Sequence, residues 1–261
     1  MKQWRISYQF STEFTGQVNR HYYKLRCFPK EDATQRISYL RWSVDPPCKE
    51  ALMTDIFGNR VLNGCCMEPH EQFSVSVNAV ITKRNLVLPE PAEYHKWGMM
   101  RSATVQTAMG DSLQRFYETL DQKEHTAPWG RASELMHAVY GAFSYVSGST
   151  QFATTAEEAF SQGCGVCQDY AHILLALLRH EDITVRYVAG AIPGEGQSHA
   201  WIEVLQDGFW KGFDPTHDRE TDDTYISFVV GRDACDCGMN RGIFRNAAEG
   251  AQRVMVKMEE F

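Results

Sequence analysis

The sequence lacks long hydrophobic runs: none of its 261 residues belongs to a stretch approaching the roughly 20 consecutive apolar residues of a membrane-spanning helix. Its first ten residues, MKQWRISYQF, lack both an apolar core and a small-residue cleavage site, so they do not resemble a secretory signal. An excess of basic residues is also missing, because 26 Lys and Arg stand against 33 Asp and Glu. We therefore expect a cytoplasmic protein that binds neither membranes nor nucleic acid.

Cysteine is too scarce for a disulfide scaffold. The sequence has eight cysteines, and two of them, Cys65 and Cys66, are adjacent, which is poor geometry for bridging. We expect most of the cysteines to be reduced and to fill small spaces in the core. Internal repeats and low-complexity segments are absent too, and the 43% hydrophobic content is ordinary for a globular protein.

The chain divides into two parts with different patterns. Residues 1–85 contain short alternating runs such as WRISYQF and FSVSVNAVIT, separated by turn residues, which predict an antiparallel β-sandwich. Residues 86–110 contain prolines and show no clear period, as a connector would. In residues 111–261 helical patterns precede strand patterns, so we predict an α+β domain whose helices pack on an antiparallel sheet.

The helices of the second part are indicated by spacing and by capping. Apolar residues recur at three- and four-residue intervals in residues 111–121 and 132–146, which predicts two amphipathic helices. A capping box at Thr155 predicts a short helix that ends at Gly163. A strongly apolar helix follows almost at once, so two helices meet at a glycine-rich turn.

Cys167 is the candidate nucleophile. It lies in GCGVCQDYAHILLALLRH, between the glycine-rich turn and the apolar helix. The positive end of a helix favours the thiolate, and its unpaired N–H groups can stabilise the oxyanion formed on a carbonyl. Gly163 and Gly165 are expected to leave room for a substrate backbone, and Gln168 is a candidate for oxyanion binding. Taken alone, Cys167 also fits the pattern of a small core residue.

A hairpin supplies the partners of this cysteine. The segment HAWIEVLQDGFWKGFDPT predicts two strands joined at Asp207-Gly208, a dipeptide typical of type I′ turns. A two-residue loop makes His199 and Asp214 diagonal neighbours, whereas a shifted loop sets them directly opposite, and both registers put them on one face. A histidine held by a carboxylate can act as a general base toward a thiol.

Taken separately, these residues have other interpretations: a structural histidine on a sheet, and an aspartate that starts a turn before proline. Their joint placement downstream of a helix-capping cysteine favours a triad of Cys167, His199 and Asp214. Trp201 falls on the same face of the hairpin. It and Trp210 either line a substrate channel or serve packing.

Three motifs in this order resemble the bacterial transglutaminase-like enzymes, which are often described as cysteine proteases: GVCQDYAH (165–172), SHAWIEV (198–204) and GFDPT (212–216). GRDACDCGMNRGIF (231–244) is similar to a Gly-Arg-Asp segment of that family, and DIFGNRV (55–61) to a turn in its N-terminal β domain. The resemblance implies a papain-like catalytic fold after the β domain. The sequence departs from the family pattern at the cysteine of position 164 and at the cysteines of the Gly-Arg-Asp segment.

The resemblance implies that Cys167 is the nucleophile, His199 the general base and Asp214 its orienting acid, with neither a metal nor an organic cofactor. We therefore predict an acyl-transfer enzyme that attacks peptide or glutamine-type amides through a thioester. Its partner is then a peptide or protein substrate. Hydrolysis is the favoured outcome because water is always present, and a protein-crosslinking transglutaminase is the alternative. The sequence makes no prediction of oligomeric state.

Other classes of protein stay open. Cys164, Cys167, Cys235 and Cys237 could together bind zinc, which would make this region a metal-binding interaction module. A domain that kept the fold without catalysis is another possibility. The spacing of Cys164 and Cys167 also suggests a regulatory disulfide that would switch the enzyme off.

Overall fold

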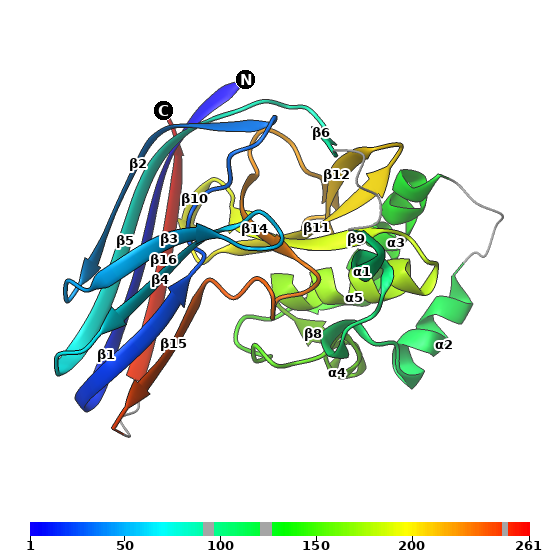
Figure 1. Ribbon diagram of the computed structural model, residues 1–261. Helices are drawn as coiled ribbons and strands as arrows, with labels where there is room; N and C mark the ends of the chain where they lie inside the picture. The colour runs from blue at the N-terminus through cyan, green and yellow to red at the C-terminus, as the bar shows by residue number, and fades with distance from the viewer. Residues whose placement is uncertain (91–96, 121–126, 247–249) are drawn as a thin grey trace.

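Figure 1 shows the computed structural model, in which a region of long β-strands packs against a region of helices and shorter strands. The structure describes residues 1–90, 97–120, 127–246 and 250–261. Part of the predicted connector, residues 91–96, and the last residue of the first predicted helix, Asp121, lie outside the described residues.

The first region is built around one very long strand, β1, whose first and last parts pair with different strands. The first part of β1 pairs with β5 and β16, and its last part pairs with β4 and β15, all antiparallel. Trp4, Ile6, Tyr8 and Phe10 are buried at alternate positions of β1, as the sequence pattern predicts. The strands are β1 (Lys2–Leu25), β2 (Gln35–Asp45), β3 (Lys49–Thr54), β4 (Arg60–Cys66), β5 (His70–Lys83), β10 (Gly194–Gly196), β15 (Asn240–Arg245) and β16 (Gly250–Glu260).

The last two strands differ from the predicted domain organisation. Strands β15 and β16 follow the second region in sequence, yet they pair with β1 at the start of the chain. Figure 1 shows the C-terminus beside the N-terminus in the same layer. The domain predicted over residues 111–261 therefore loses its final strands to the first region. An alternating pattern of apolar and polar residues predicts a strand but does not specify which strand it pairs with, because the pairing joins segments far apart in sequence.

The second region contains a sheet with strand order β13-β12-β11-β9-β14, and β6 lies beside β12. Its strands are β6 (Leu88–Pro89), β9 (Val185–Ala191), β11 (His199–Gln206), β12 (Phe209–Asp214), β13 (Arg219–Glu220) and β14 (Ile226–Gly231), and a separate parallel pair consists of β7 (Ser144–Tyr145) and β8 (Cys164–Gly165). The helical segments are α1 (Gly98–Arg101), the 3₁₀ turn η2 (Val105–Thr107), α2 (Asp111–Thr119), α3 (Pro128–Ala142), α4 (Ala156–Gln162) and α5 (Cys167–His180). The predicted α+β class, a β-sandwich followed by helices on an antiparallel sheet, is confirmed.

The helix boundaries follow local chemistry. In α4 the Thr155 hydroxyl accepts the N–H of Glu158 at 3.2 Å, and the Glu158 carboxylate accepts the N–H of Thr155 at 2.8 Å, which confirms the predicted capping box. The helix ends at Gly163, whose φ is 78°. Helix α3 begins earlier than predicted because Pro128 occupies its first turn, where a missing N–H has no cost.

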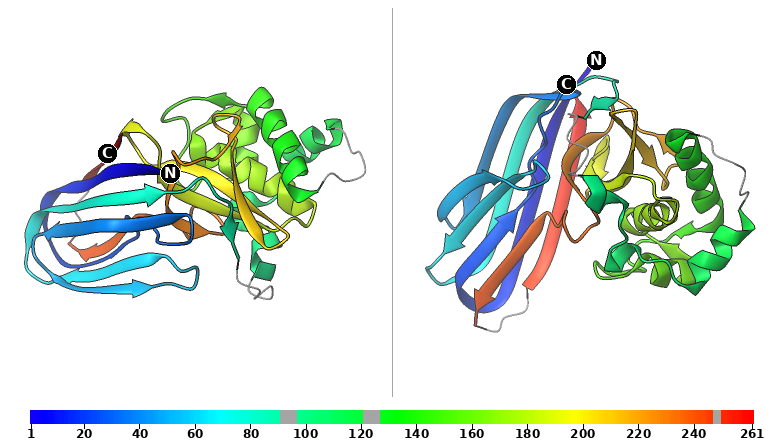
Figure 2. Two further views of the ribbon diagram at one scale, coloured as in Figure 1. Left: turned by 90° about the horizontal axis from the view of Figure 1, so that it is seen from above. Right: turned by 45° about the vertical axis from the view of Figure 1, so that its right-hand side comes forward.

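The second sheet lies between the helices and the β-sandwich, as the two views of Figure 2 show. One face carries Ala200, Ile202 and Val204 into a core shared with α3 and α5. From the other side, Ile226 and Phe228 of β14 join the core of the β-sandwich. The two regions therefore share a continuous apolar interface.

Two buried side-chain amides also fasten the regions together along β14. The Asn59 amide donates to the carbonyl of Val230 and accepts the N–H of Val230, both at 2.8 Å. In the same way the Gln35 amide donates to the carbonyl of Ser227 at 2.7 Å and accepts its N–H at 3.1 Å. Asn59 belongs to the DIFGNRV turn, so that motif is an interdomain contact.

Replacing Asn59 with alanine is expected to lower the free energy of unfolding by about 3 kcal/mol, because both backbone groups of Val230 would be buried without a partner. Chemical denaturation measures the change. Asn63 is a matched control, since its amide contacts only the sulfur of Met53 among the described residues. Asn63→Ala should change the free energy by less than about 0.5 kcal/mol. Equal losses in the two variants would contradict the role of Asn59.

The cysteines differ in part from the expectation. Cys48 and Cys66 form a disulfide, while the remaining six are free: Cys27, Cys65, Cys164, Cys167, Cys235 and Cys237. Disulfides are typical of oxidising compartments, so the cytoplasmic address stays a prediction. No helix in the described part of the chain is both long and apolar enough to cross a lipid bilayer.

Candidate active site

Cys167 is the first residue of α5 and is partly buried, as predicted for a cysteine at a helix N-terminus. The side chain of Asp169 fixes this helix start, because its carboxylate accepts the N–H of Val166 at 2.8 Å and the hydroxyl of Thr150 at 2.6 Å. Burial raises the pKa of Asp169, although these hydrogen bonds oppose the shift. The Asp169 carboxylate therefore fixes the turn before Cys167 through hydrogen bonds to Val166 and to Thr150.

The two glycines before Cys167 have structural roles that differ from the predicted one. Gly163 takes a left-handed conformation that ends α4. A Cβ atom on Gly165 would lie 2.7 Å from the Cβ atom of Asp169 and 2.8 Å from the ring of Phe143. Gly165 thus leaves room for the helix cap and its packing rather than for a substrate.

The hairpin that carries the other two candidates has the two-residue loop. Gln206 pairs with Phe209, so Asp207 and Gly208 form the loop, and their φ angles are 52° and 81°. Positive φ at both positions is what a type I′ turn requires. In this register His199 and Asp214 are diagonal neighbours on adjacent strands.

The side chains of His199 and Asp214 are in direct contact. His199 donates from Nε2 to Oδ2 of Asp214 at 2.7 Å, and the carboxylate is fully buried. The same oxygen accepts hydrogen bonds from Nδ1 of His217 at 2.7 Å and from the hydroxyl of Tyr225 at 2.8 Å. The other oxygen accepts the N–H of Thr216 at 2.9 Å. Asp214 therefore both starts a turn and holds His199.

The electrostatics of the site favour a charged His199. Burial lowers the pKa of His199, but hydrogen bonds to Asp214 and Cys167 outweigh burial and raise it from 6.5 to about 9. Burial also opposes ionisation of Asp214, yet the hydrogen bonds from His199 and His217 hold the pKa of that carboxyl well below its usual range. Because Nε2 faces Asp214, Nδ1 is the ring nitrogen that remains for Cys167. The structure thus brings the three predicted residues together.

The sequence did not reveal three side chains that surround this group. His217 lies three residues after Asp214. The Asp-Pro-Thr-His order indicates a turn that brings the ring of His217 back to the Asp214 carboxylate. Tyr225 directly precedes β14, and the alternating pattern there predicts a strand without specifying which residue the Tyr225 hydroxyl contacts. Burial and the charge of the nearby Cys167 raise the pKa of Tyr145, which is 56% exposed.

Both tryptophans that were considered for a channel serve packing. Trp201 is 1% exposed, and its ring centroid lies 6.2 Å from that of His199 in a stacked arrangement. Trp210 is equally buried and donates its indole N–H to Glu90. The amide of Gln168 donates to the carbonyl of Phe152 at 3.2 Å. A side-chain amide has two N–H donors, so the role of Gln168 in oxyanion binding stays a prediction.

The zinc alternative is not supported by the arrangement of the cysteines. Within the described ranges, the side chains that could together hold a metal are His199, Asp214 and His217, and no cysteine is among them. Cys235 instead accepts a hydrogen bond from the Gln106 amide at 3.3 Å. Hydrogen bonds to one carboxylate oxygen already explain why the two histidines converge.

The Gly-Arg-Asp segment forms a turn against α5. The N–H of Ala234 donates to Nε2 of His172 at 3.1 Å, inside the core. Arg179 donates to the carbonyl of Arg232 at 2.6 Å, and Asp233 accepts the N–H of Cys235 at 2.8 Å. This motif therefore positions the chain that leads back to the β-sandwich.

A cysteine at a helix start, followed by a histidine and an aspartate on one hairpin, is an arrangement that defines a transglutaminase-like domain. The model of the transglutaminase-like superfamily matches residues 115–215, and the model of the bacterial transglutaminase-like N-terminal region matches residues 4–82. The chain belongs to the bacterial transglutaminase-like proteins with this N-terminal region.

Similar chains cover nearly the whole length of this one. An uncharacterised protein of Mycobacterium leprae is 29% identical over 98% of both chains. Another, from Mycobacterium tuberculosis, is 27% identical over 95% of this chain and 88% of its own. The crystal structure of a candidate cysteine protease from Cytophaga hutchinsonii matches with a TM-score of 0.81 at 20% identity, covering 99% of this chain and 90% of that one. This likeness confirms the fold.

Proposed function

We propose that this protein is a cysteine-nucleophile acyl-transfer enzyme that acts on peptide or glutamine-type amides and transfers the acyl group to water. Cys167 is the nucleophile, His199 the general base and acid, and Asp214 the orienting carboxylate. The observation that supports this proposal is the position of His199, whose Nε2 donates to a fully buried carboxylate while the Cys167 thiol lies close enough to help raise the pKa of its ring.

The proposed reaction has two steps. The Cys167 thiolate attacks the amide carbonyl carbon, and N–H groups of the first turn of α5 stabilise the oxyanion. The C–N bond then breaks, the thioester forms, and the imidazolium of His199 gives its proton to the leaving amine. In the second step His199 takes a proton from water and the hydroxide attacks the thioester carbonyl. The C–S bond then breaks, the carboxylic acid is released, and the Cys167 thiolate and the His199 imidazolium are restored.

Hydrolysis and crosslinking differ only in the acceptor of the acyl group. A lysine side chain in place of water would give a transglutaminase, and access to the thioester decides between the two. We favour hydrolysis because water reaches every thioester that an amine can reach. A peptide or protein is the proposed substrate in both cases.

Mass spectrometry of lysate peptides incubated with wild type and with Cys167→Ala tests the function. New peptide termini identify a protease, Gln-to-Glu shifts an amidase and crosslinked peptides a transglutaminase. The products should be absent with Cys167→Ala. If wild type and variant give identical peptide profiles, the acyl-transfer proposal fails.

A further inference from the structure

A cavity of about 440 Å³ lies beside the candidate triad, between the two regions of the chain. Gln168 and Ser198, the chain neighbours of Cys167 and His199, line it from one side. Tyr8 and Gln252 of the β-sandwich line it from the other. Its volume is that of an ordinary ligand site, and Gln168 and Ser198 place its wall next in the chain to the candidate nucleophile and base.

Arg241 of β15 also lines this cavity, and its side chain is exposed. Its guanidinium donates to the carbonyl of Cys235 at 2.6 Å and lies over the ring of Phe152, 5.8 Å from the centroid. A Cβ atom on Gly238 would come within 2.8 Å of Nε of Arg241, so the glycine leaves the space that this side chain occupies. The Phe152 carbonyl in turn accepts a hydrogen bond from the side-chain amide of Gln168, the residue that follows the candidate nucleophile in the chain.

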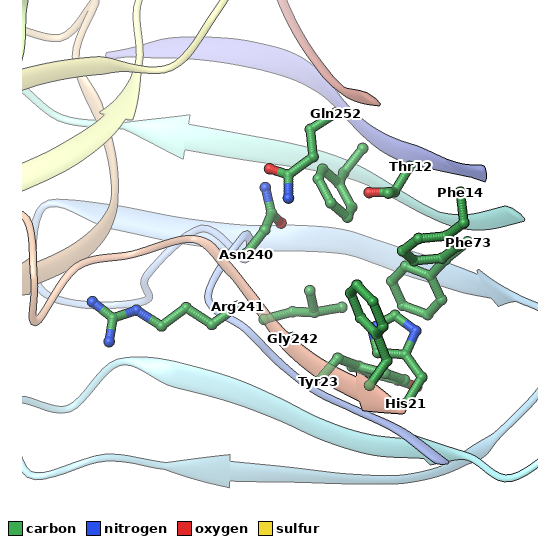
Figure 3. A pocket seen from close by; sticks show the side chains of 12 residues that line it. Thr12, Phe14, His21, Tyr23, Phe73, Asn240, Arg241, Gly242 and Gln252 are labelled. Carbon is green, nitrogen blue, oxygen red and sulfur yellow. The ribbon is translucent and has the colours of Figure 1, made fainter. Parts of the chain in front are cut away.

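The neighbouring residue fixes the strand that presents Arg241. The Asn240 amide donates to the hydroxyl of Tyr8 at 2.6 Å and so ties β15 to β1. Figure 3 shows Arg241 extending away from the aromatic cluster that contains Phe14 and His21. Arg241 thus lines both the interdomain cavity and the smaller one of Figure 3, and its guanidinium points away from the aromatic cluster.

The charge around Arg241 is unbalanced. Throughout the described ranges, no Asp or Glu lines this cavity, and no carboxylate lies within ion-pair distance of Arg241. A guanidinium has five N–H donors in a planar fork that matches a carboxylate, and among the described residues one protein oxygen, the carbonyl of Cys235, accepts from that of Arg241.

We infer that the interdomain cavity binds an acidic peptide segment, whose carboxylate pairs with Arg241 while the adjoining amide reaches Cys167. The inference rests on the proposed function, because it names the substrate class of the same site. It also accounts for the choice of acceptor, since a cavity with an arginine and no acid repels the ammonium group of lysine.

The first test compares the products of wild type and of Arg241→Gln in the lysate-peptide experiment. Wild-type product sites should carry Asp or Glu near the reacting amide, and Arg241→Gln should reduce this enrichment by roughly five- to tenfold, the range that one partly exposed ion pair supplies. Arg241→Lys should keep part of the preference. Arg245→Gln is the matched control, because this exposed arginine of the same strand lines none of the cavities around it. It should leave the enrichment unchanged.

A second measurement does not depend on turnover. Two pools of tetrapeptides without glutamine, identical except for glutamate in place of serine, are used to protect Cys167 from iodoacetamide. The glutamate pool should protect better in wild type and in Arg245→Gln, but not in Arg241→Gln. Pools with free and amidated C-termini distinguish a side-chain carboxylate from a terminal one.

The outcomes separate this inference from the proposed function. Products that depend on Cys167 but show no acidic enrichment, or an enrichment that survives in Arg241→Gln, overturn the acidic subsite and leave the enzyme proposal intact. If no such products form, the protection experiment decides. Preferential protection by glutamate that is lost in Arg241→Gln then supports the subsite, and equal protection by both pools overturns it.

Discussion

Replacing Cys167 with alanine is expected to lower acyl-transfer activity by about 10⁶-fold, because removal of the nucleophile leaves only binding and oxyanion contacts to assist the reaction. The fold should survive, since Cys167 is only partly buried and contributes no backbone constraint of its own. Kinetics on a peptide identified by mass spectrometry measure the loss. Circular dichroism and the denaturation midpoint should match those of wild type.

Cys164→Ala is the matched control for this prediction. Cys164 is a free cysteine three residues earlier, and its sulfur accepts a hydrogen bond from the Gln162 amide at 3.3 Å. The variant should retain activity, and iodoacetamide should alkylate Cys167 faster than Cys27, which is fully buried. Loss of activity in Cys164→Ala with a normal Cys167→Ala would exchange the roles of the two thiols. Sensitivity to peroxide that persists in Cys164→Ala would rule out the disulfide switch.

The candidate triad could be predicted because its signals are local. A glycine-rich turn before an apolar run indicates a helix start at Cys167, and Asp207-Gly208 fixes the hairpin register that sets His199 beside Asp214. Each signal needs only a few neighbouring residues. The roles of all three residues stay predictions until activity is measured.

What could not be predicted depends on long-range pairing. Arg241 lines the same cavity as Gln168 only because β15 joins β1, and no residue of β15 specifies that pairing. Asn59 likewise reaches β14 across the interface between the two regions, 171 residues away in sequence. In each case the partner is far away in sequence and the pattern around the residue is ordinary. The sequence therefore predicts the candidate reacting residues better than it predicts the residues that surround them.

Replacing Asp214 with asparagine is expected to reduce the maximal rate by about 10⁴-fold, the effect known for a triad that loses its carboxylate. An amide can donate to Nε2 of His199, which stabilises the tautomer with a proton on Nδ1, the nitrogen that faces the thiol. The buried site would also lose an anion that three donors now share: His199, His217 and Tyr225. Activity and denaturation measured together separate the two effects.

The same variant changes the pH dependence in a defined direction. In wild type the pKa of His199 is raised from 6.5 to about 9, so its protonated form stabilises the fold fully below pH 6.5, and this contribution is lost as the pH rises through about 9. Activity that needs the imidazolium should decline over the same interval. In Asp214→Asn burial acts without the carboxylate, so the alkaline decline should move below pH 9. Asp207→Asn, which keeps a turn-forming residue on the exposed loop, should leave rate and decline unchanged; an identical pH profile in Asp214→Asn would contradict the assigned role of that carboxylate.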